Sequence, residues 1–293
     1  MAKKPARPPQ PAAEPIVVSP RWLAGAFAIV LLLAALCGYA ALCLLFYQGQ
    51  WQLLFHPSRE ISATPASLGL PFEEAHFDVD NTGHPQLDGW YIPAAQGAPY
   101  ESATVLYLHD AHGSLSDCVP ALDTLHTAGI NVFAFDYRGF GLSSGAHPTE
   151  GTATADAGAA WTYLTDLRHI PPRSLIAFGA GVGATFAAHL AVEFAPAGII
   201  LEDPNQTARA IYLTDARARI LPLWFLQNET LDPSADLAGA HVPRLFLDIH
   251  GDSARTRNLF NASSPPKQYV DLRSSPESAV IASLRRFFDD VVR

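Results

Sequence analysis

The sequence has few cysteines and comparatively few basic residues. Only Cys37, Cys43 and Cys118 occur in 293 residues, and the first two lie in one apolar run, so a disulfide framework cannot be the basis of the fold. The chain has 19 basic and 28 acidic side chains; beyond residue 21 the balance is 15 to 27. An acidic surface repels nucleic acid, and no basic stripe appears, so nucleic-acid binding is excluded as a function class.

Charge is absent from residues 22–47, which are rich in Leu, Ala, Val and Ile. These 26 residues exceed the ~20 that an α-helix needs to cross a bilayer. A cleaved signal peptide has a shorter apolar region of about 7–15 residues. The pattern predicts a single-pass transmembrane helix over residues 22–47, with the lipid bilayer as a partner. Residues 1–21 are rich in proline and predict a disordered tail.

The charges around this apolar segment predict its orientation. Residues 1–21 hold four basic side chains and one acidic side chain, and the first charge after the segment is Arg59. The positive-inside rule therefore predicts a cytoplasmic N-terminus and an extracytoplasmic domain over residues 48–293. Tyr47, Trp51 and Phe55 recur every four residues, which favours an aromatic strip lying at the membrane surface or packed on the domain.

Residues 48–293 alternate between strand-like and helical patterns. Two strands joined by a turn at residues 81–84 predict an antiparallel pair, and later strands alternate with helices. This order predicts a single α/β domain with a mostly parallel sheet of about eight strands and helices on both faces. The predicted strands are 74–80, 87–92, 103–108, 130–135, 174–178, 198–201, 244–249 and 268–272, and the predicted helices are about 116–127, 150–167, 182–194 and 277–292.

Three loops at predicted strand ends carry a family resemblance. The run from Asp136 to Gly145 (DYRGFGLSSG) resembles the loop after the fourth strand of α/β-hydrolases. The run from Leu108 to Gly113 is similar to the segment that supplies an oxyanion-hole amide, and Pro243 to Gly251 resembles a strand ending in His-Gly. The chain is thus identified as similar to the α/β-hydrolase superfamily, in particular its membrane-anchored BEM46-like and ABHD13-like branch. The resemblance implies the α/β-hydrolase fold.

The catalytic positions of that family are not kept. The family's nucleophile elbow, G-x-S-x-G, corresponds to residues 179–183, where Gly181 takes the place of serine. The family's acid position corresponds to Ala254 or to Asp252, and no histidine follows His250. Without a hydroxyl and an imidazole, serine hydrolysis has neither a nucleophile nor a general base. The sequence therefore predicts a degenerate member in which no catalytic residue is intact.

Backbone donors can survive the loss of catalytic side chains. The Val182 amide opens a predicted helix, and Asp110 and Ala111 offer a second amide, so an oxyanion-hole-like site for a carboxylate or carbonyl ligand is predicted there. His109, His112 and His250 follow strands at the same sheet edge and are candidate pocket residues.

These patterns leave several functions open. The first is a pseudoenzyme with a binding or scaffold role toward an unknown small molecule or protein. The second is an active hydrolase or esterase on ester or acyl substrates with relocated catalytic residues, for which Ser114, Ser116, Ser143 and Ser144 are candidates. Whether the chain is an enzyme is left undecided by the sequence.

Two ligand classes are weaker alternatives. Gly179, Gly181 and Ala184 match a dinucleotide fingerprint, with Asp203 about 20 residues on, although a lone match of this kind is a weak signal. A metal site formed by Asp248, His250 and Asp252, with His109 and His112 from another strand end, is also conceivable. We expect neither a cofactor nor a metal ion.

Overall fold

The structure is a computed structural model that describes residues 19–79, 83, 84, 86–145 and 147–292. The predicted tail of residues 1–21 lies almost entirely outside these residues, as does part of the predicted turn at 81–84. The chain divides into two compact units, residues 1–46 and 47–293. Each unit is described by itself.

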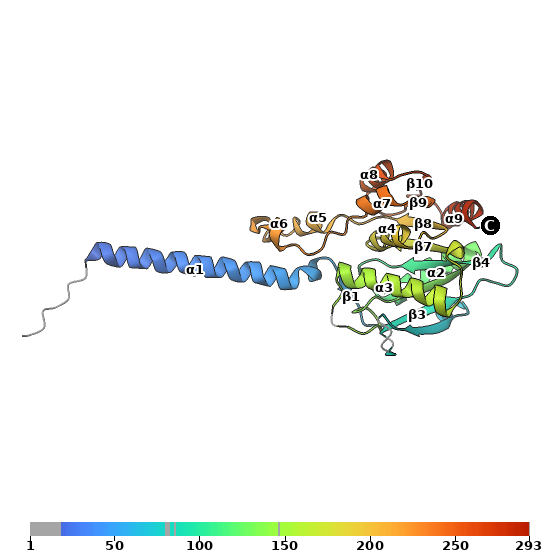
Figure 1. Cartoon of the computed structure of the whole chain (residues 1–293), viewed down its shortest axis with the longest axis horizontal. Helices are drawn as coiled ribbons and strands as arrows, with labels where there is room; N and C mark the ends of the chain where they lie inside the picture. Colours follow the sequence, from blue (N-terminus) through green and yellow to red (C-terminus); the bar gives the residue numbers. More distant parts are fainter. Residues whose placement is uncertain (1–18, 80–82, 85, 146, 293) are drawn as a thin grey trace, which may run out of the picture. The chain divides into compact units, whose positions relative to one another are not determined.

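The first unit contains most of helix α1 (Pro20–Gly49) (Figure 1). The helix carries one charged residue, Arg21, at its start, and the candidate span reaches a mean hydropathy of 2.7 in its most apolar window. Its length and apolarity are sufficient to cross a bilayer. The helix begins two residues before and ends two residues after the predicted segment of residues 22–47.

The second unit is built on an eight-stranded sheet with the order β10-β9-β8-β7-β4-β6-β3-β2. Strand β3 pairs antiparallel with both β2 and β6, and the remaining pairs are parallel. This is the α/β-hydrolase fold, as the sequence predicts. The strands are β2 (Glu73–Phe77), β3 (Leu87–Ile92), β4 (Tyr100–Leu108), β6 (Ile130–Phe135), β7 (Leu175–Ala180), β8 (Gly198–Glu202), β9 (Arg244–Asp248) and β10 (Lys267–Asp271).

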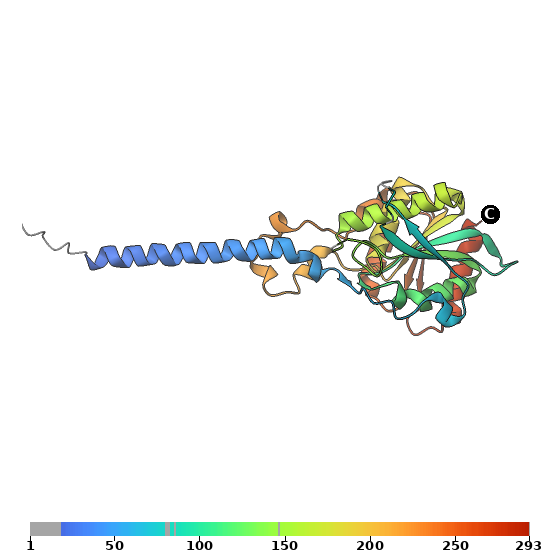
Figure 2. The same ribbon diagram turned by 90° about the horizontal axis from the view of Figure 1, so that it is seen from below.

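Helices cover both faces of the sheet because its central strands are apolar on both sides (Figures 1 and 2). Helices α2 (Leu115–Ala128) and α9 (Glu277–Val291) pack together on one face, and α3 (Glu150–Thr162) and α4 (Gly183–Glu193) on the other. All six residues of β7 are buried, which explains why its run alternates so little in polarity. A π-helical turn, Tyr163–Leu167, continues α3 to the end of the predicted helix.

The segment between β8 and β9 contains four short helices: α5 (Ala208–Tyr212), the 3-10 turn Ala218–Ile220, α6 (Leu223–Leu226) and α7 (Ser234–Gly239). Gln50, in the 3-10 turn Gln50–Leu53, is buried and ties this segment to the start of the domain. Its side-chain amide donates to the Leu226 carbonyl at 3.2 Å, and its carbonyl oxygen accepts from Tyr212 Oη at 3.1 Å and the Asn228 amide at 3.0 Å.

Three further elements lie outside the sequence prediction. Helix α8 (Ser253–Ala262) follows β9, and the short strands β1 (His56–Pro57) and β5 (His112–Gly113) form a separate parallel pair. Two residues of the predicted aromatic strip pack on the domain. Phe55 is buried in it, and the ring of Trp51 stacks on that of His147 with centroids 4.9 Å apart. For these two residues, packing on the domain is the alternative that holds.

Candidate functional site

The chain makes a sharp turn from β7 into α4 at Gly181. Gly181 has φ +57°, in the left-handed region, where a residue with a Cβ is strained. Its amide donates to the Glu202 carbonyl of β8 at 3.0 Å. This is the elbow shape that presents a nucleophile in α/β-hydrolases, and glycine adopts it without strain.

The neighbouring glycines allow close packing of the elbow. A Cβ on Gly183 would overlap the Leu108 carbonyl oxygen of β4, and a Cβ on Gly179 would overlap the Gly183 carbonyl. The strand-to-helix turn is therefore pressed against the end of β4. The contacts account for the glycines at 179 and 183 without any bound nucleotide.

The carboxyl group of Asp110 occupies the space in front of Gly181. A Cβ on Gly181 would overlap Asp110 Oδ1, so this carboxyl lies where a nucleophile side chain would begin. Asp110 Oδ1 accepts from the Val182 amide at 3.0 Å and from Asn205 Nδ2 at 3.0 Å. The sequence predicts a backbone donor near Asp110 and Ala111 and an anionic ligand beside Val182. In the structure, the anion at Val182 is the side chain of Asp110 itself.

Hydrogen bonds to the Asp110 carboxyl favour its ionised form. Burial alone would raise the pKa of Asp110, but hydrogen bonds from His112 and from the Val182 and Ala111 amides outweigh burial and lower it. His112 Nδ1 lies 3.5 Å from Asp110 Oδ2, and this contact raises the pKa of His112. His56 stacks on His112 with ring centroids 4.7 Å apart, and burial together with His112 lowers the pKa of His56. An anionic oxygen and an imidazole therefore meet at the elbow.

The two residues that correspond to the family's acid position, Asp252 and Ala254, both belong to the start of helix α8. Asp252 caps α8 and accepts from the Ala254 amide at 3.0 Å and the Arg255 amide at 3.4 Å. Ala254 lies in the first turn of that helix. Asp248, which the sequence suggests only as a metal ligand, is the carboxylate at the end of β9. Asp248 is fully buried and accepts from Tyr269 Oη at 3.0 Å.

The three candidate pocket histidines do not converge. His109 is buried, with Nδ1 2.6 Å from the Asp110 carbonyl oxygen, and burial lowers its pKa to about 4. It is packed in the domain interior and lines neither of the two cavities described below. His250 is exposed, with Nδ1 3.9 Å from Asp203 Oδ2. Within the described part of the chain, no three His, Cys, Asp or Glu side chains converge as metal ligands.

The acidic residue of the dinucleotide fingerprint is already engaged. Asp203 has φ +43°, and its carboxylate accepts from the Ile249 amide at 2.9 Å and the His250 amide at 2.8 Å. These contacts join the ends of β8 and β9. With Asp203 held there and Asp110 in front of the elbow, the geometry is unlike the open ribose and phosphate site that the fingerprint requires.

A cavity of about 470 Å³ lies beside the elbow on the face covered by α2 and α9. Phe178 and Leu284 contribute apolar walls, while Glu202 and His250 lie at strand ends. Burial, with the neighbouring charges of Asp203 and Asp110, raises the pKa of Glu202 to about 7. Ser275, in the loop where the family histidine is expected, also lines the cavity. Of the three predicted pocket histidines, His250 lines this cavity; the rest of its walls could not be predicted from the sequence, because five separate stretches of the chain form them.

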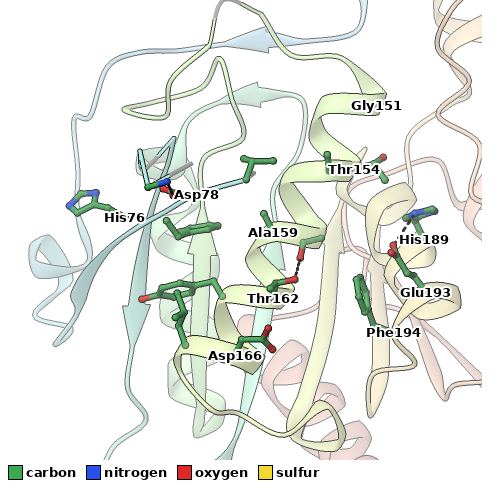
Figure 3. Close-up of a pocket in the computed structure, with 17 residues that line it drawn as sticks. His76, Asp78, Gly151, Thr154, Ala159, Thr162, Asp166, His189, Glu193 and Phe194 are labelled. Carbon is green, nitrogen blue, oxygen red and sulfur yellow. Dashed lines mark hydrogen bonds and ion pairs between the residues drawn. The ribbon is translucent and has the colours of Figure 1, made fainter. Parts of the chain in front are cut away.

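A second, broader groove of about 900 Å³ lies on the opposite face (Figure 3). Small residues of α3, including Gly151, Thr154 and Ala159, lie between His76 of the β2 region and His189 of α4 in this view. None of the sequence-predicted site residues lines this groove. It is therefore separate from the elbow.

The amino-acid sequence matches one family model and several individual proteins over different lengths. Residues 100–236 match the family described as serine aminopeptidase, S33. An uncharacterized protein of Mycobacterium tuberculosis is 28% identical over 256 residues, covering 82% of this chain and 88% of that protein. The uncharacterized protein YfhR of Escherichia coli is 28% identical over 192 residues, covering 63% of this chain and 66% of YfhR.

The fold is similar to solved α/β-hydrolase structures. The esterase Pf2001 of Pyrococcus furiosus aligns with a TM-score of 0.64 at 16% identity, covering 82% of this chain and 98% of the esterase. An alpha-beta hydrolase from Vibrio vulnificus aligns with a TM-score of 0.60 at 20% identity, covering 80% of this chain and 87% of that hydrolase. At these identities the likeness concerns the fold alone.

Proposed function

We propose that this chain, an α/β-hydrolase-fold protein, is anchored in a membrane and acts by binding a ligand, without serine hydrolysis. One observation carries the proposal: the Asp110 carboxyl lies in the space in front of Gly181 and accepts from the Val182 amide. The nucleophile is missing, and the donor that would stabilise an oxyanion is already engaged. A substrate carbonyl would have to displace an ionised carboxylate.

The other catalytic positions support the same proposal. Asp252 caps a helix, and no histidine follows His250 in the sequence. Three of the four candidate serines use their hydroxyls elsewhere: Ser114, Ser116 and Ser143 donate to the backbone carbonyls of Glu60, Ala63 and Asp136, respectively. Ser144 is exposed in the same turn as Ser143. In the described ranges none of the four bonds to an imidazole, so none is activated as a nucleophile.

A binding role has a site available beside the elbow. The cavity of about 470 Å³ combines apolar walls with a few polar groups, which is the usual composition of a small-molecule site. It lies at the carboxyl ends of the strands, where α/β folds bind ligands. This cavity is the binding site that we propose.

Membrane anchoring is the second part of the proposal. Helix α1 has the length and hydropathy of a membrane span, and the basic residues of the chain's start precede it. We place the N-terminus in the cytoplasm and residues 48–293 outside it. The combination of an apolar helix and the three hydrolase-like loops supports assignment to the BEM46-like or ABHD13-like branch, as a degenerate member.

A fluorophosphonate probe tests the catalytic part, because it labels an activated serine wherever it lies in the sequence. The full chain in lipid nanodiscs is incubated with the probe beside an active serine esterase as a positive control. We expect no label on this protein and full labelling of the esterase. Labelling that disappears on one Ser→Ala substitution would refute the proposal and support the relocated hydrolase.

A second candidate is hydrolysis that uses Asp110 and His112 in place of the triad. It is favoured by the 3.5 Å approach of His112 Nδ1 to Asp110 Oδ2 at an exposed position. Turnover of p-nitrophenyl butyrate by the wild-type protein, abolished in His112→Ala and unaffected by the fluorophosphonate, would establish this candidate. Equal, background turnover by both proteins would remove it.

A further inference from the structure

The segment between β8 and β9 exposes large apolar side chains. Ile220, Trp224 and Phe225 are 63%, 80% and 72% exposed, and the two aromatic rings lie 5.9 Å apart. Neighbouring Leu223 and Leu226 are buried, so α6 is anchored in the domain by one side and presents the other to its surroundings. Exposed apolar side chains that gather in this way mark an interaction surface.

The same segment is basic within an acidic domain. Residues 204–226 contain Arg209, Arg217 and Arg219 and one acidic residue, Asp215. The remainder of the chain after residue 21 has 12 basic and 26 acidic residues. All three arginines are exposed, and Arg217 pairs with Asp215 at 2.7 Å. We call the surface formed by these three arginines with Ile220, Trp224 and Phe225 the α6 edge.

The covalent chain keeps the α6 edge near the end of the apolar run. Gln50 is three residues beyond Tyr47, the last residue of that run. A chain spans at most about 3.6 Å per residue, so the two residues are at most roughly 11 Å apart. Gln50 in turn bonds to the Leu226 carbonyl and to the Asn228 amide, directly after α6. A bilayer crossed by the apolar run therefore has its surface within reach of α6.

We propose that the α6 edge inserts into the surface of the bilayer, with Ile220, Trp224 and Phe225 among the lipid chains and the arginines on anionic headgroups. Trp is a preferred side chain at this depth, and basic residues flanking apolar ones are typical of interfacial helices. The inference rests on the proposed membrane anchoring. It assigns to the α6 edge the interfacial role that the buried Phe55 does not fill.

A fluorescent label on single cysteines tests the insertion. In the full chain, with Cys37, Cys43 and Cys118 replaced by Ala, the variants Phe225→Cys and Leu167→Cys are labelled with an NBD dye. Leu167 is 69% exposed, at the end of the π-helical turn after α3, and is the matched control. The proteins are placed in nanodiscs of phosphatidylcholine with 30% phosphatidylglycerol, with or without doxyl-labelled lipid.

We expect the dye at residue 225 to emit at shorter wavelength and to be quenched by lipid labelled about 5–10 Å below the headgroups, and the dye at 167 to remain water-exposed. Water-like emission without quenching at 225 would overturn the inference. Replacing the three arginines by Gln should weaken the insertion equilibrium about fivefold per arginine. Undiminished insertion of that triple variant would overturn the headgroup contacts.

The anchoring itself is checked by carbonate extraction of membranes that carry the full chain. A protein released by carbonate contradicts the proposed anchoring. A protein that resists carbonate while residue 225 stays in water contradicts the α6 edge alone. The two failures are thus distinguishable.

Discussion

The loops after β4 and β7 differ from those after β9 and β10 in how closely they match the geometry of an α/β-hydrolase site. At the first pair, the backbone has the elbow shape at Gly181 and an amide at Val182 that binds an anion. At the second pair, Asp252 is a helix cap and the loop after β10 has no histidine. Tight packing of the chain thus fixes the backbone geometry at the first pair of loops, whichever side chains the site carries.

Substitution of the tightly packed Gly183 is expected to cause the largest loss of stability. In Gly183→Ala, the new methyl would overlap the Leu108 carbonyl, which is fixed in β4, so we expect a loss of about 3 kcal/mol in the free energy of unfolding. Gly158→Ala in α3 is the control: its Cβ meets nothing within 4 Å, and alanine favours the helix by up to about 1 kcal/mol. Urea unfolding in nanodiscs measures both. Equal stability of the two variants would show that the elbow is not tightly packed.

Substitution of Gly181, at the elbow itself, is expected to cause the next largest loss of stability. Gly181→Ser places a Cβ at φ +57° against the Asp110 carboxyl, and we expect it to lower the unfolding free energy by about 2 kcal/mol and to create no esterase activity. Removing the obstruction in Asp110→Ala/Gly181→Ser should make the pair less costly than the sum of its single variants by about 1 kcal/mol. Strict additivity would mean that Asp110 does not occupy the nucleophile's space.

A smaller effect is expected from Asp110→Asn, which exchanges charge-assisted hydrogen bonds for neutral ones. We expect a loss of about 1 kcal/mol at pH 7. The pKa of Asp110 is lowered in the folded protein. The wild type therefore has its full excess of unfolding free energy over Asp110→Asn above the ordinary pKa of 3.8, and it loses this excess as the pH falls through the folded pKa. A pH series of unfolding curves for both proteins checks this. If the difference in unfolding free energy between the two proteins does not change as the pH is lowered, the pKa of Asp110 is not lowered in the folded protein.

The smallest effect is expected at His250, whose side chain is 85% exposed. His250→Ala should change the unfolding free energy by less than about 0.5 kcal/mol, since it removes little packing. The same urea series measures it. A loss above about 1 kcal/mol would mean that the His250 side chain itself stabilises the loop after β9.

Much of the fold was predictable because apolar runs and turn residues determine it locally. The predicted run over residues 130–135 is β6 itself, and the missing side chain at Gly181 was visible in the sequence. The contact between Asp110 and Val182 was not, since it depends on how two loops 72 residues apart meet. Helix α8 lies outside the prediction because the sequence does not distinguish an acid position from an N-cap at Asp252, and the structure shows an N-cap.

The Asp110 carboxylate also limits which molecules can reach the elbow. Any soluble anion that approaches Val182 meets a competitor attached to the same chain, whose effective concentration exceeds that of most free metabolites. Small carboxylates are thereby kept out, and an occupant must either move the loop after β4 or approach beside it. Serine hydrolysis at this elbow would require moving the Asp110 carboxylate as well as placing a serine at position 181.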